Sequence, residues 1–340
     1  MSGARITALD FETGDHYSLE QYRTLQQVFC EGIPKEYLLQ YFSDEEKQAD
    51  EHRFIASESE LSDFVSGTGI HAVSCIGNQT ASEFAATLVQ KFVENSAGFL
   101  KNGIDYIIYC HTAMEKNIML SPACRMQYVS GYKHAQPFSV SQMGPVAFFK
   151  GLEIALSMLQ CAPNATVLMV CADQMIWPEK RYYPQIACYG DGCAMALVQS
   201  AAGGDGMQVH AARTGRIPAM ASGMAISEFK KSLVSDTTNF LKVFLNRCQY
   251  TAADIGLIVP PGINKSWVRE INTSIGADDA QLFFDGLDQF GSLSAADPLA
   301  NIAMANRSER LDRHKPLLLW GVSMNGSIGC ALIQLGNNEQ

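Results

Sequence analysis

Apolar positions follow two patterns that alternate along most of the chain. Runs such as Thr166–Ala172 and Pro316–Gly321 are almost entirely apolar, which is typical of strands with helices on both faces of a sheet. Between such runs, apolar residues recur at helical spacing, as in Thr80–Val93 and Ala147–Leu159. The alternation predicts an α/β fold of the doubly wound kind.

The predicted elements occur twice in a similar order. In the first part they are a helix at Thr80–Val93, a strand at Asp105–Cys110, a helix at Ser121–Gly131, a strand at Pro137–Ser141, a helix at Ala147–Leu159, and strands at Thr166–Ala172 and Gly192–Gln199. In the second part they are a helix at Glu228–Cys248, a strand at Ile255–Val259, a helix at Lys265–Ile275, a strand at Gln281–Asp285, a helix at Ala295–Ser308, and strands at Pro316–Gly321 and Ser327–Leu335. We therefore expect a pseudo-duplicated α/β/α/β/α stack of five layers, with halves at residues 1–205 and 206–340.

Length and composition agree with this interpretation. The 340 residues fit two domains, or two halves that share one core, and the 47% apolar share is that of a globular protein with a large core. The helix at Glu228–Cys248 has an apolar stripe that we expect to face this core, made of Phe229, Leu233, Phe240, Val243 and Phe244. Residues 18–66 are polar and poorly periodic, and they support no element prediction.

The charge of the chain narrows the classes of partner. A net charge of −10 and a pI near 5.2 argue against nucleic-acid binding, which needs a clustered basic surface. A local basic patch for a phosphopantetheine carrier is still compatible with this charge. No apolar run approaches the about 20 residues of a membrane span, and the N-terminal residues lack the pattern of a signal peptide. We therefore expect a cytoplasmic protein without a membrane partner.

The ten cysteines include no CxxC pair, so neither a zinc site nor any other metal site is predicted. Most of them lie inside apolar segments, where a free thiol behaves as a small hydrophobic group, and this suits a reducing compartment. Cys124 and Cys188 are expected to be buried and inert for the same reason. Asp191, which lies between two glycines, is expected to anchor a turn through backbone N–H groups.

Several short stretches, taken in order along the chain, point to one known family. They are Thr68-Gly69-Ile70, the run from Ser121 to Phe138, the turn Tyr189-Gly190-Asp191-Gly192, and a C-terminal group at Val259–Asn264, Phe290–Ala296 and Gly326–Leu332. This set resembles the β-ketoacyl-acyl-carrier-protein synthase III family of the thiolase superfamily. The resemblance implies the thiolase fold, a tight dimer that pairs across a sheet edge, and acyl transfer from coenzyme A or acyl-carrier-protein thioesters as substrates, without a bound cofactor.

The residues that this family uses for catalysis are replaced here. In the family, a cysteine at the start of the long buried helix accepts the acyl group, assisted by a histidine and an asparagine. The cysteine position falls on Gly144, or on Pro145 if one gap is moved, the histidine position on Pro261, and the asparagine position on Ser292. Because such groups act as a unit, the resemblance implies a degenerate site that cannot condense thioesters by the family mechanism.

Other positions of the family's site also differ. Its glycine run near the C-terminus falls on Ser323–Asn325, and two residues that hold coenzyme A fall on Asp63 and Gly67. A pocket lined by Met, Pro and Gly can still hold an acyl chain or a pantetheine arm without acting on it. The residues expected to bind such a substrate are Gln142, Met143, Pro145, Asn264 and Asn325.

Two further side chains near the lost nucleophile allow other chemistry. His111 follows a strand, and the carboxyl ends of strands line sites in open α/β sheets. Ser141 offers a hydroxyl, which needs an adjacent base to become a nucleophile. Each has a structural alternative, namely a partly buried histidine with satisfied ring nitrogens and a strand-end hydroxyl that bonds to the backbone.

Three functions are compatible with these residues, and in only one of them does this chain itself catalyse a reaction. The first is a synthase III-like subunit of an acyl-transfer or condensing system in fatty-acid-like or specialised metabolism, such as polyketide formation, in which the chain is the non-catalytic half of a heterodimer with an intact homologue. The second is an acyltransferase, homodimeric or heterodimeric, that moves an acyl group directly to an acceptor without a cysteine nucleophile. The third is a scaffold that binds acyl or pantetheine groups without turnover.

Overall fold

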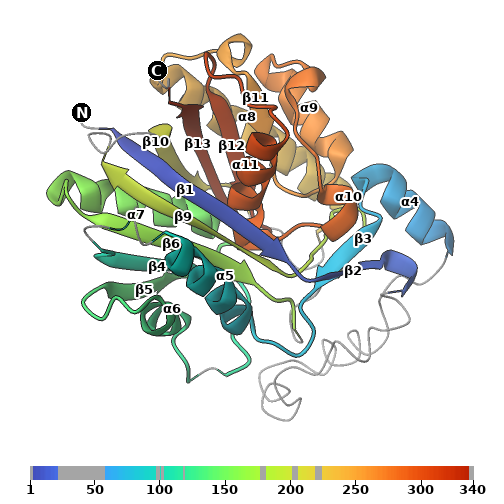
Figure 1. The fold of residues 1–340 in the computed structure, drawn as a ribbon. Helices are drawn as coiled ribbons and strands as arrows, with labels where there is room; N and C mark the ends of the chain where they lie inside the picture. Colours follow the sequence, from blue (N-terminus) through green and yellow to red (C-terminus); the bar gives the residue numbers. More distant parts are fainter. Residues whose placement is uncertain are drawn as a thin grey trace.

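A computed structural model describes residues 3–21, 58–96, 100, 103–117, 119–176, 181–200, 206–218 and 224–336. Its centre is a nine-stranded sheet with the order β11-β12-β13-β10-β1-β9-β6-β4-β5 (Figure 1). The strands of this sheet are β1 (Ala4–Thr13), β4 (Tyr106–Cys110), β5 (Gln136–Val140), β6 (Thr166–Asp173), β9 (Gly192–Ser200), β10 (Met207–Arg216), β11 (Leu257–Val259), β12 (Leu317–Val322) and β13 (Ser327–Leu335). Two small sheets pair β2 (Asp15–Ser18) with β3 (Ala72–Cys75), and β7 (Tyr182–Tyr183) with β8 (Ala187–Cys188).

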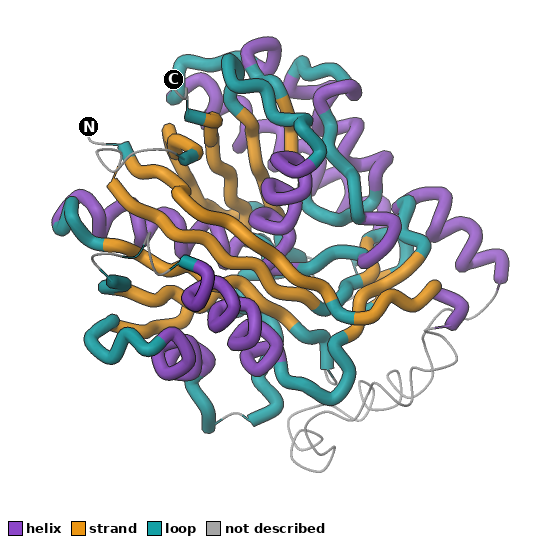
Figure 2. Tube along the Cα trace, viewed as in Figure 1, coloured by secondary structure: helices purple, strands orange, loops and turns teal. Residues whose placement is uncertain are grey.

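Helices cover the sheet on both faces, as Figure 2 shows. They are α4 (Glu58–Thr68), α5 (Ala81–Asn95), α6 (Pro122–Ser130), α7 (Val146–Cys161), α8 (Ile226–Arg247), α9 (Lys265–Ile275), α10 (Leu287–Phe290) and α11 (Asp297–Arg307), with short 3-10 turns at Ala252–Asp254, Asp279–Gln281 and Ser294–Ala296. In Figure 1, α5 and α6 lie at one end of the molecule and α8 and α9 at the other. Among the described helices, none is both long and apolar enough to cross a bilayer.

Three apolar clusters arrange these elements in five layers. One cluster joins α5 and α6 to the outer face of β4, β6 and β9, and another joins α8 and α9 to β11, β12 and β13. The largest cluster contains α7 and α11, which pack between the two parts of the sheet. The predicted five-layer α/β architecture is therefore confirmed, with one addition. The two half-sheets are joined into one by three register pairs between β1 and β10.

The two parts of the sheet repeat the same order of strand directions. From β4 through β6 and β9 to β1, the successive pairings are parallel, antiparallel and antiparallel. From β11 through β12 and β13 to β10, they are again parallel, antiparallel and antiparallel. This repetition agrees with the duplication inferred from the order of elements. The division at residues 205 and 206 stays a prediction, because residues 201–205 lie outside the described ranges.

The predicted strand at Gln281–Asp285 is wrong. Leu282 forms a single parallel bridge to Ile258 in β11, at the place that β5 occupies in the first half, and the Phe283 N–H donates to the Ile258 carbonyl. The chain then turns at Gly286, which has a φ of 85°, and α10 begins one residue later. The turn leaves no room for a second pair of ladder hydrogen bonds.

Two other predictions need correction. Val243 does not belong to the buried face of α8, because 46% of its surface is exposed, whereas Leu241 and Leu245 are buried. Cys124 is exposed rather than buried, because it lies in the first turn of α6, where its N–H bonds to the Ser121 side chain that caps the helix. The other predicted helices and strands are confirmed, with bounds that differ by up to two residues.

The ring of Phe149 on α7 fixes the distance between the middle layer and the C-terminal part of the sheet. Gly321 and Gly329 are register partners on β12 and β13. A Cβ atom at Gly329 would lie 2.7 Å from Cβ of Phe149, and one at Gly321 would lie 2.8 Å from the ring. The two glycines therefore form a flat place on which the phenylalanine packs, and α7 approaches the sheet more closely than larger side chains would allow.

We expect Gly329→Val to lower the free energy of unfolding by about 1–3 kcal/mol, because the added methyl groups overlap with Phe149. Urea unfolding followed by circular dichroism measures this change. In a double-mutant cycle, Phe149→Ala should cost less in the valine background than in the wild type, because the overlap is relieved. Equal costs in both backgrounds would show that the two residues are not in contact.

Candidate functional site

Asp173 lies at the carboxyl end of β6 and is 1% exposed. One carboxylate oxygen accepts hydrogen bonds from the N–H groups of Thr112 (2.6 Å) and Ala113 (2.9 Å), which follow β4. The other oxygen accepts from the N–H group of Ala295 at 3.0 Å. Burial raises the pKa of Asp173 above its usual range, and these hydrogen bonds oppose that change. The carboxylate thus ties the end of β4 to the loop that precedes α11.

Asp297 is the first residue of α11 and is also buried, at 2% exposed. Its Oδ2 atom accepts hydrogen bonds from the Ser292 hydroxyl (2.7 Å) and from the Gly262 N–H (3.1 Å), and Oδ1 accepts from the Leu293 N–H (2.6 Å). Burial raises its pKa to about 6, while these three hydrogen bonds lower it and the charge of Asp173 raises it. The loop between Ser292 and α11 is therefore held by a carboxylate at each end.

Pro261 and Ser292, which resemblance aligns with the family's histidine and asparagine, belong to adjoining loops. A Cβ atom at Gly262 would lie 2.8 Å from Cβ of Ser292, so the two loops are in close contact. Pro261 has no polar side-chain atom, and the Ser292 hydroxyl already donates its proton to Asp297. Neither side chain can donate a hydrogen bond to a thioester carbonyl in this arrangement.

The turn between β5 and α7 contains two residues with positive φ, Gln142 at 62° and Gly144 at 58°. Left-handed backbone at a non-glycine residue such as Gln142 is uncommon and costs energy. Two hydrogen bonds hold it in place: the Gln142 N–H donates to the His111 carbonyl (3.2 Å), and the Gln142 carbonyl accepts from the side chain of Asn325 (2.6 Å). The side chain of Gln142 is exposed at the start of a buried helix.

The same turn packs against the loop between β12 and β13. A Cβ atom at Gly144 would lie 3.1 Å from the Ser323 side chain, and one at Gly321 would lie 3.3 Å from Pro145. Met143 is partly buried against the central apolar cluster. Four of the five predicted substrate-binding residues, at positions 142, 143, 145 and 325, are therefore neighbours. Their binding role stays a prediction.

Asn264, the fifth, lies elsewhere and is the N-cap of α9. Its Oδ1 atom accepts hydrogen bonds from the N–H (3.0 Å) and the hydroxyl (2.6 Å) of Ser266, and its Nδ2 atom donates to the Gln185 carbonyl (2.8 Å). A Cβ atom at Gly67 would lie 3.0 Å from that nitrogen. The side chain therefore has a structural role at the contact between α4 and α9.

His111 and Ser141 lie side by side just beyond the ends of β4 and β5. The His111 N–H donates to the Val140 carbonyl and the His111 carbonyl accepts from the Gln142 N–H, which extends the parallel register by one pair beyond Cys110 and Val140. Paired residues of neighbouring strands project from the same face of a sheet. The Nδ1 atom of His111 lies 2.9 Å from the Ala113 carbonyl and must donate to it, so Nε2 of the neutral ring is an acceptor. The sequence suggested each residue separately, and the structure brings them together.

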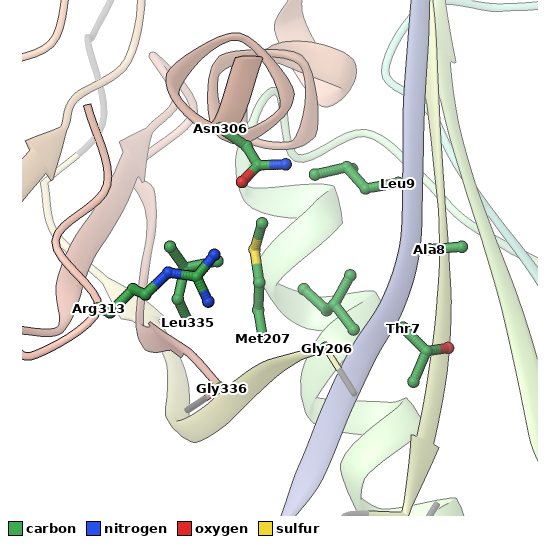
Figure 3. Close-up of a pocket in the computed structure, with 10 residues that line it drawn as sticks. Thr7, Ala8, Leu9, Gly206, Met207, Asn306, Arg313, Leu335 and Gly336 are labelled. Atoms are coloured by element: carbon green, nitrogen blue, oxygen red, sulfur yellow. The ribbon is translucent and has the colours of Figure 1, made fainter. Parts of the chain in front are cut away.

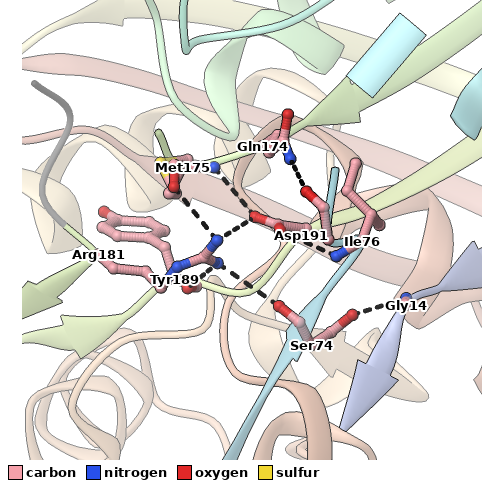
Figure 4. A network of polar contacts seen from close by, with 9 residues as sticks. Gly14, Ser74, Ile76, Gln174, Met175, Arg181, Tyr189 and Asp191 are labelled. Carbon is pink, nitrogen blue, oxygen red and sulfur yellow. Dashed lines mark hydrogen bonds and ion pairs between the residues drawn. The ribbon is translucent and has the colours of Figure 1, made fainter. Parts of the chain in front are cut away.

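Figure 4 shows a buried ion pair between Arg181 and Asp191. Arg181 lies 2.7 Å from Asp191, and Asp191 also accepts hydrogen bonds from the N–H groups of Ile76 (3.1 Å) and Met175 (3.0 Å). Arg181 donates to the Tyr189 and Met175 carbonyls as well. The predicted role of Asp191 as a turn anchor is confirmed, and its charge is neutralised by Arg181, which precedes β7 whereas Asp191 follows β8.

Sequence reasoning missed Asp173, Asp297 and Arg181. A partial signal existed for Asp173, because a carboxylate that directly ends an apolar strand must find donors when both faces of the sheet are covered. Asp297 starts a helix and precedes Pro298, which is a common helix N-terminus. For Arg181 no pattern exists beyond the rule that a buried aspartate such as Asp191 needs a cation.

Most cysteines in the described part of the chain are buried. Six cysteines are buried, at positions 75, 110, 171, 188, 193 and 330, and burial raises the pKa of the Cys188 thiol to about 12. Burial also raises the pKa values of Cys75, Cys171, Cys193 and Cys330, and a thiol with a raised pKa is a poor nucleophile. Within the described ranges, no group of three His, Cys, Asp or Glu side chains is placed to hold a metal ion.

The raised pKa of Asp297 predicts a pH effect on stability. In the unfolded chain its pKa is near 3.8, and in the folded protein it is about 6, so folding favours the protonated form. Because the folded protein binds this proton more tightly than the unfolded chain, protonation of Asp297 stabilises the fold. This stabilisation is present in full below pH 3.8 and is lost as the pH rises through 6. We expect the stability difference between the wild type and Asp297→Asn to shrink by roughly 2–3 kcal/mol between pH 4 and pH 7. Urea unfolding at several pH values measures it, and a constant difference would contradict the prediction.

Comparison with known proteins agrees with this architecture. Residues 245–335 match the family model for the C-terminal part of 3-oxoacyl-[acyl-carrier-protein (ACP)] synthase III. No curated protein sequence matches the chain. The synthase III structure from Pseudomonas aeruginosa PAO1 has a TM-score of 0.74 at 16% identity, and the alignment covers 98% of this chain and 99% of that chain.

Two other structures give similar values. The synthase III from Aquifex aeolicus VF5 has a TM-score of 0.74 at 17% identity, with 98% and 100% of the two chains covered. ChlB3, named as an acyltransferase, has a TM-score of 0.73 at 16% identity, with 98% of both chains covered. The chain therefore has the synthase III fold, and its residues 245–335 carry the sequence pattern of that family's C-terminal part.

Proposed function

We propose that this protein is the non-catalytic subunit of an acyl-transfer or condensing system in fatty-acid-like or specialised metabolism. In this proposal it pairs with a homologue that has an intact Cys-His-Asn set. The observation that carries it is the state of the three aligned positions: Gly144 and Pro261 have no reactive side chain, and the hydroxyl of Ser292 is bound to Asp297. These residues support the loops of a synthase III fold without supplying its chemistry.

The edge of the sheet at β5 supports the pairing. The inward hydrogen bonds of β5 use the Val140 carbonyl and the N–H groups of Gln136 and Gln142. Because successive residues of a strand point their polar groups to opposite sides, the N–H and carbonyl of Ser139 point away from β4. Pro137, also on the outward side, lacks an N–H. β5 is the last strand of the sheet, so Ser139 offers hydrogen bonds to a strand of another subunit.

The turn between β5 and α7 supports a contribution to the partner's substrate pocket. Gln142, Met143 and Asn325 form one surface beside this open edge, and Pro145 is buried beneath it. In our proposal they line the path of an acyl-carrier-protein or coenzyme A thioester as it enters the intact subunit. The protein needs no bound cofactor for this role, and we propose that it acts in the cytoplasm.

The first prediction concerns covalent chemistry. When the isolated protein is incubated with acetyl-coenzyme A, we expect no acetyl adduct on residues 139–145, because no side chain there is activated as a nucleophile. Mass spectrometry of peptides measures this, with an intact synthase III as the positive control. An adduct on these residues, or thioester condensation by the isolated protein at rates typical of enzymes, would refute the non-catalytic role.

The second prediction concerns assembly. We expect Ser139→Pro to raise the dissociation constant of the dimer about tenfold, because the outward N–H is lost while the bonds to β4 remain. Ser139→Ala keeps the N–H and serves as the matched control. Analytical ultracentrifugation of the protein, alone and with a homologue encoded next to it, measures both variants. Equal dissociation constants for the two variants would exclude pairing through this edge.

The pairing of His111 with Ser141 favours a second candidate function. A histidine with one ring nitrogen fixed and the other free can act as a general base on an acceptor during direct acyl transfer. ChlB3, of the same fold, is named as an acyltransferase. If this function is correct, His111→Ala lowers kcat for acyl transfer about 100-fold or more. If the chain is non-catalytic, the variant leaves turnover of the reconstituted complex unchanged, and a pure scaffold gives no turnover at all.

A further inference from the structure

The two half-sheets separate close to the amino end of β1. β1 pairs with β10 only where Ala4–Ile6 lies opposite Met207–Val209. Its pairing with β9 has an irregularity between Ile6 and Ala8, after which β1 continues along β9 while β10 continues along β13. Gly206 lies at this point with a φ of 141°, and a Cβ atom there would lie 2.5 Å from the Ile6 carbonyl oxygen. The backbones are thus in contact at the junction and diverge beyond it.

A pocket of about 250 Å³ opens where the strands diverge (Figure 3). Apolar side chains of Ile6, Leu9, Met207 and Leu335 line it. Asn306, near the end of α11, and Arg313, in the loop between α11 and β12, add two polar side chains. Figure 3 shows these two side chains together with Met207 and Leu335 around the pocket.

The pocket is remote from the candidate site. Thr7, in its wall, donates a hydrogen bond to Gln199, and Gln199 is the register partner of Thr166 at the amino end of β6. Asp173 lies at the carboxyl end of the same strand, and seven residue steps span roughly 23 Å. A ligand of this pocket would therefore not touch the residues discussed above.

Two polar side chains of the pocket, Asn306 and Arg313, carry N–H groups that can donate hydrogen bonds to an anion. A guanidinium group recognises carboxylates through paired N–H donors, and a carboxamide can add one more. The backbone of Arg313 is held because its carbonyl accepts from the Gln334 side chain at 3.1 Å. The nearby acidic groups are engaged: Asp10 pairs with Arg307 at 2.6 Å, and Asp312 accepts from the His314 N–H at 2.8 Å.

We propose that this pocket binds a small carboxylic acid with a short alkyl chain. The carboxylate lies against Arg313 and Asn306, and the chain lies among Met207, Leu335 and Leu9. A cavity of about 150 Å³ holds benzene, and pockets for drug-sized ligands begin at about 300 Å³. The volume of about 250 Å³ therefore fits an acid of roughly six to eight carbons.

Titration of the full-length protein with hexanoate, followed by isothermal calorimetry and by saturation-transfer NMR, tests the proposal. We expect saturable binding to the wild type and at least tenfold weaker binding to Arg313→Leu, because a charge-assisted hydrogen-bond pair is lost. Arg310→Leu is the matched control, since the Arg310 guanidinium lies over the Phe283 ring and does not line the pocket. It should bind hexanoate as the wild type does.

Two further measurements separate the charge from the apolar contact. Hexan-1-ol, which has the same chain and no charge, should bind the wild type at least tenfold more weakly than hexanoate. Met207→Trp, which fills the pocket, should weaken both ligands. Absence of saturable binding, equal binding to Arg313→Leu and Arg310→Leu, or equal binding of the alcohol and the acid would each overturn the proposal. The comparison of the two ligands needs only the wild type, so it holds even if a variant fails to fold.

Discussion

Hydrogen bonds to two buried carboxylates, Asp173 and Asp297, connect the loops at the candidate site of this protein. Each accepts three hydrogen bonds, and together they fasten the loop that follows β4 and the loop around Gly262 to the segment Ser292–Ala296. Most of these hydrogen bonds join segments that are far apart in the sequence, namely Thr112–Ala113 with Asp173, Asp173 with Ala295, and Gly262 with Asp297. Burial disfavours the charged forms of both groups, so the loops are held at an energetic cost that only their full complement of donors offsets.

This arrangement positions the loops of a synthase III fold largely through backbone N–H groups that bond to two carboxylates. The loops that approach one another at Pro261, Ser292 and Thr112 are positioned by backbone N–H groups and the two carboxylates. Of the aligned catalytic positions, Ser292 contributes a side-chain hydroxyl to this positioning, whereas Gly144 and Pro261 contribute no polar side-chain atom. A chain can lose its nucleophile and keep the same surface for a partner, which is the physical basis of the proposed subunit role.

The sequence predicted most elements because their apolar patterns are strong, as in β6 and β12, where every residue is buried. The sequence-based prediction failed where a short apolar run can form either a strand or a turn, or where a helix position can be either buried or exposed. Gln281–Asp285 looks like a strand, but Gly286 turns the chain after a single bridge. Val243 lies at the edge of an apolar stripe, where a small rotation of α8 decides exposure. The candidate site could be located only through resemblance. The placement of His111 beside Ser141 depends on strand register, and the hydrogen bond between Ser292 and Asp297 depends on loop closure, so neither follows from local pattern.

The asymmetry between the two halves has a consequence for higher assembly. In the first half β5 is a full strand whose outer edge is open, whereas the corresponding place in the second half holds only the bridge at Leu282 beside the short strand β11. A chain whose sheet has unpaired backbone N–H and carbonyl groups along both edge strands can add copies at both edges and grow into a filament. With one long edge and one blunted edge in the described part of the sheet, strand addition is favoured at the β5 edge. In the proposed assembly this asymmetry favours a closed pair over a filament, because the second half lacks a full strand at the place of β5.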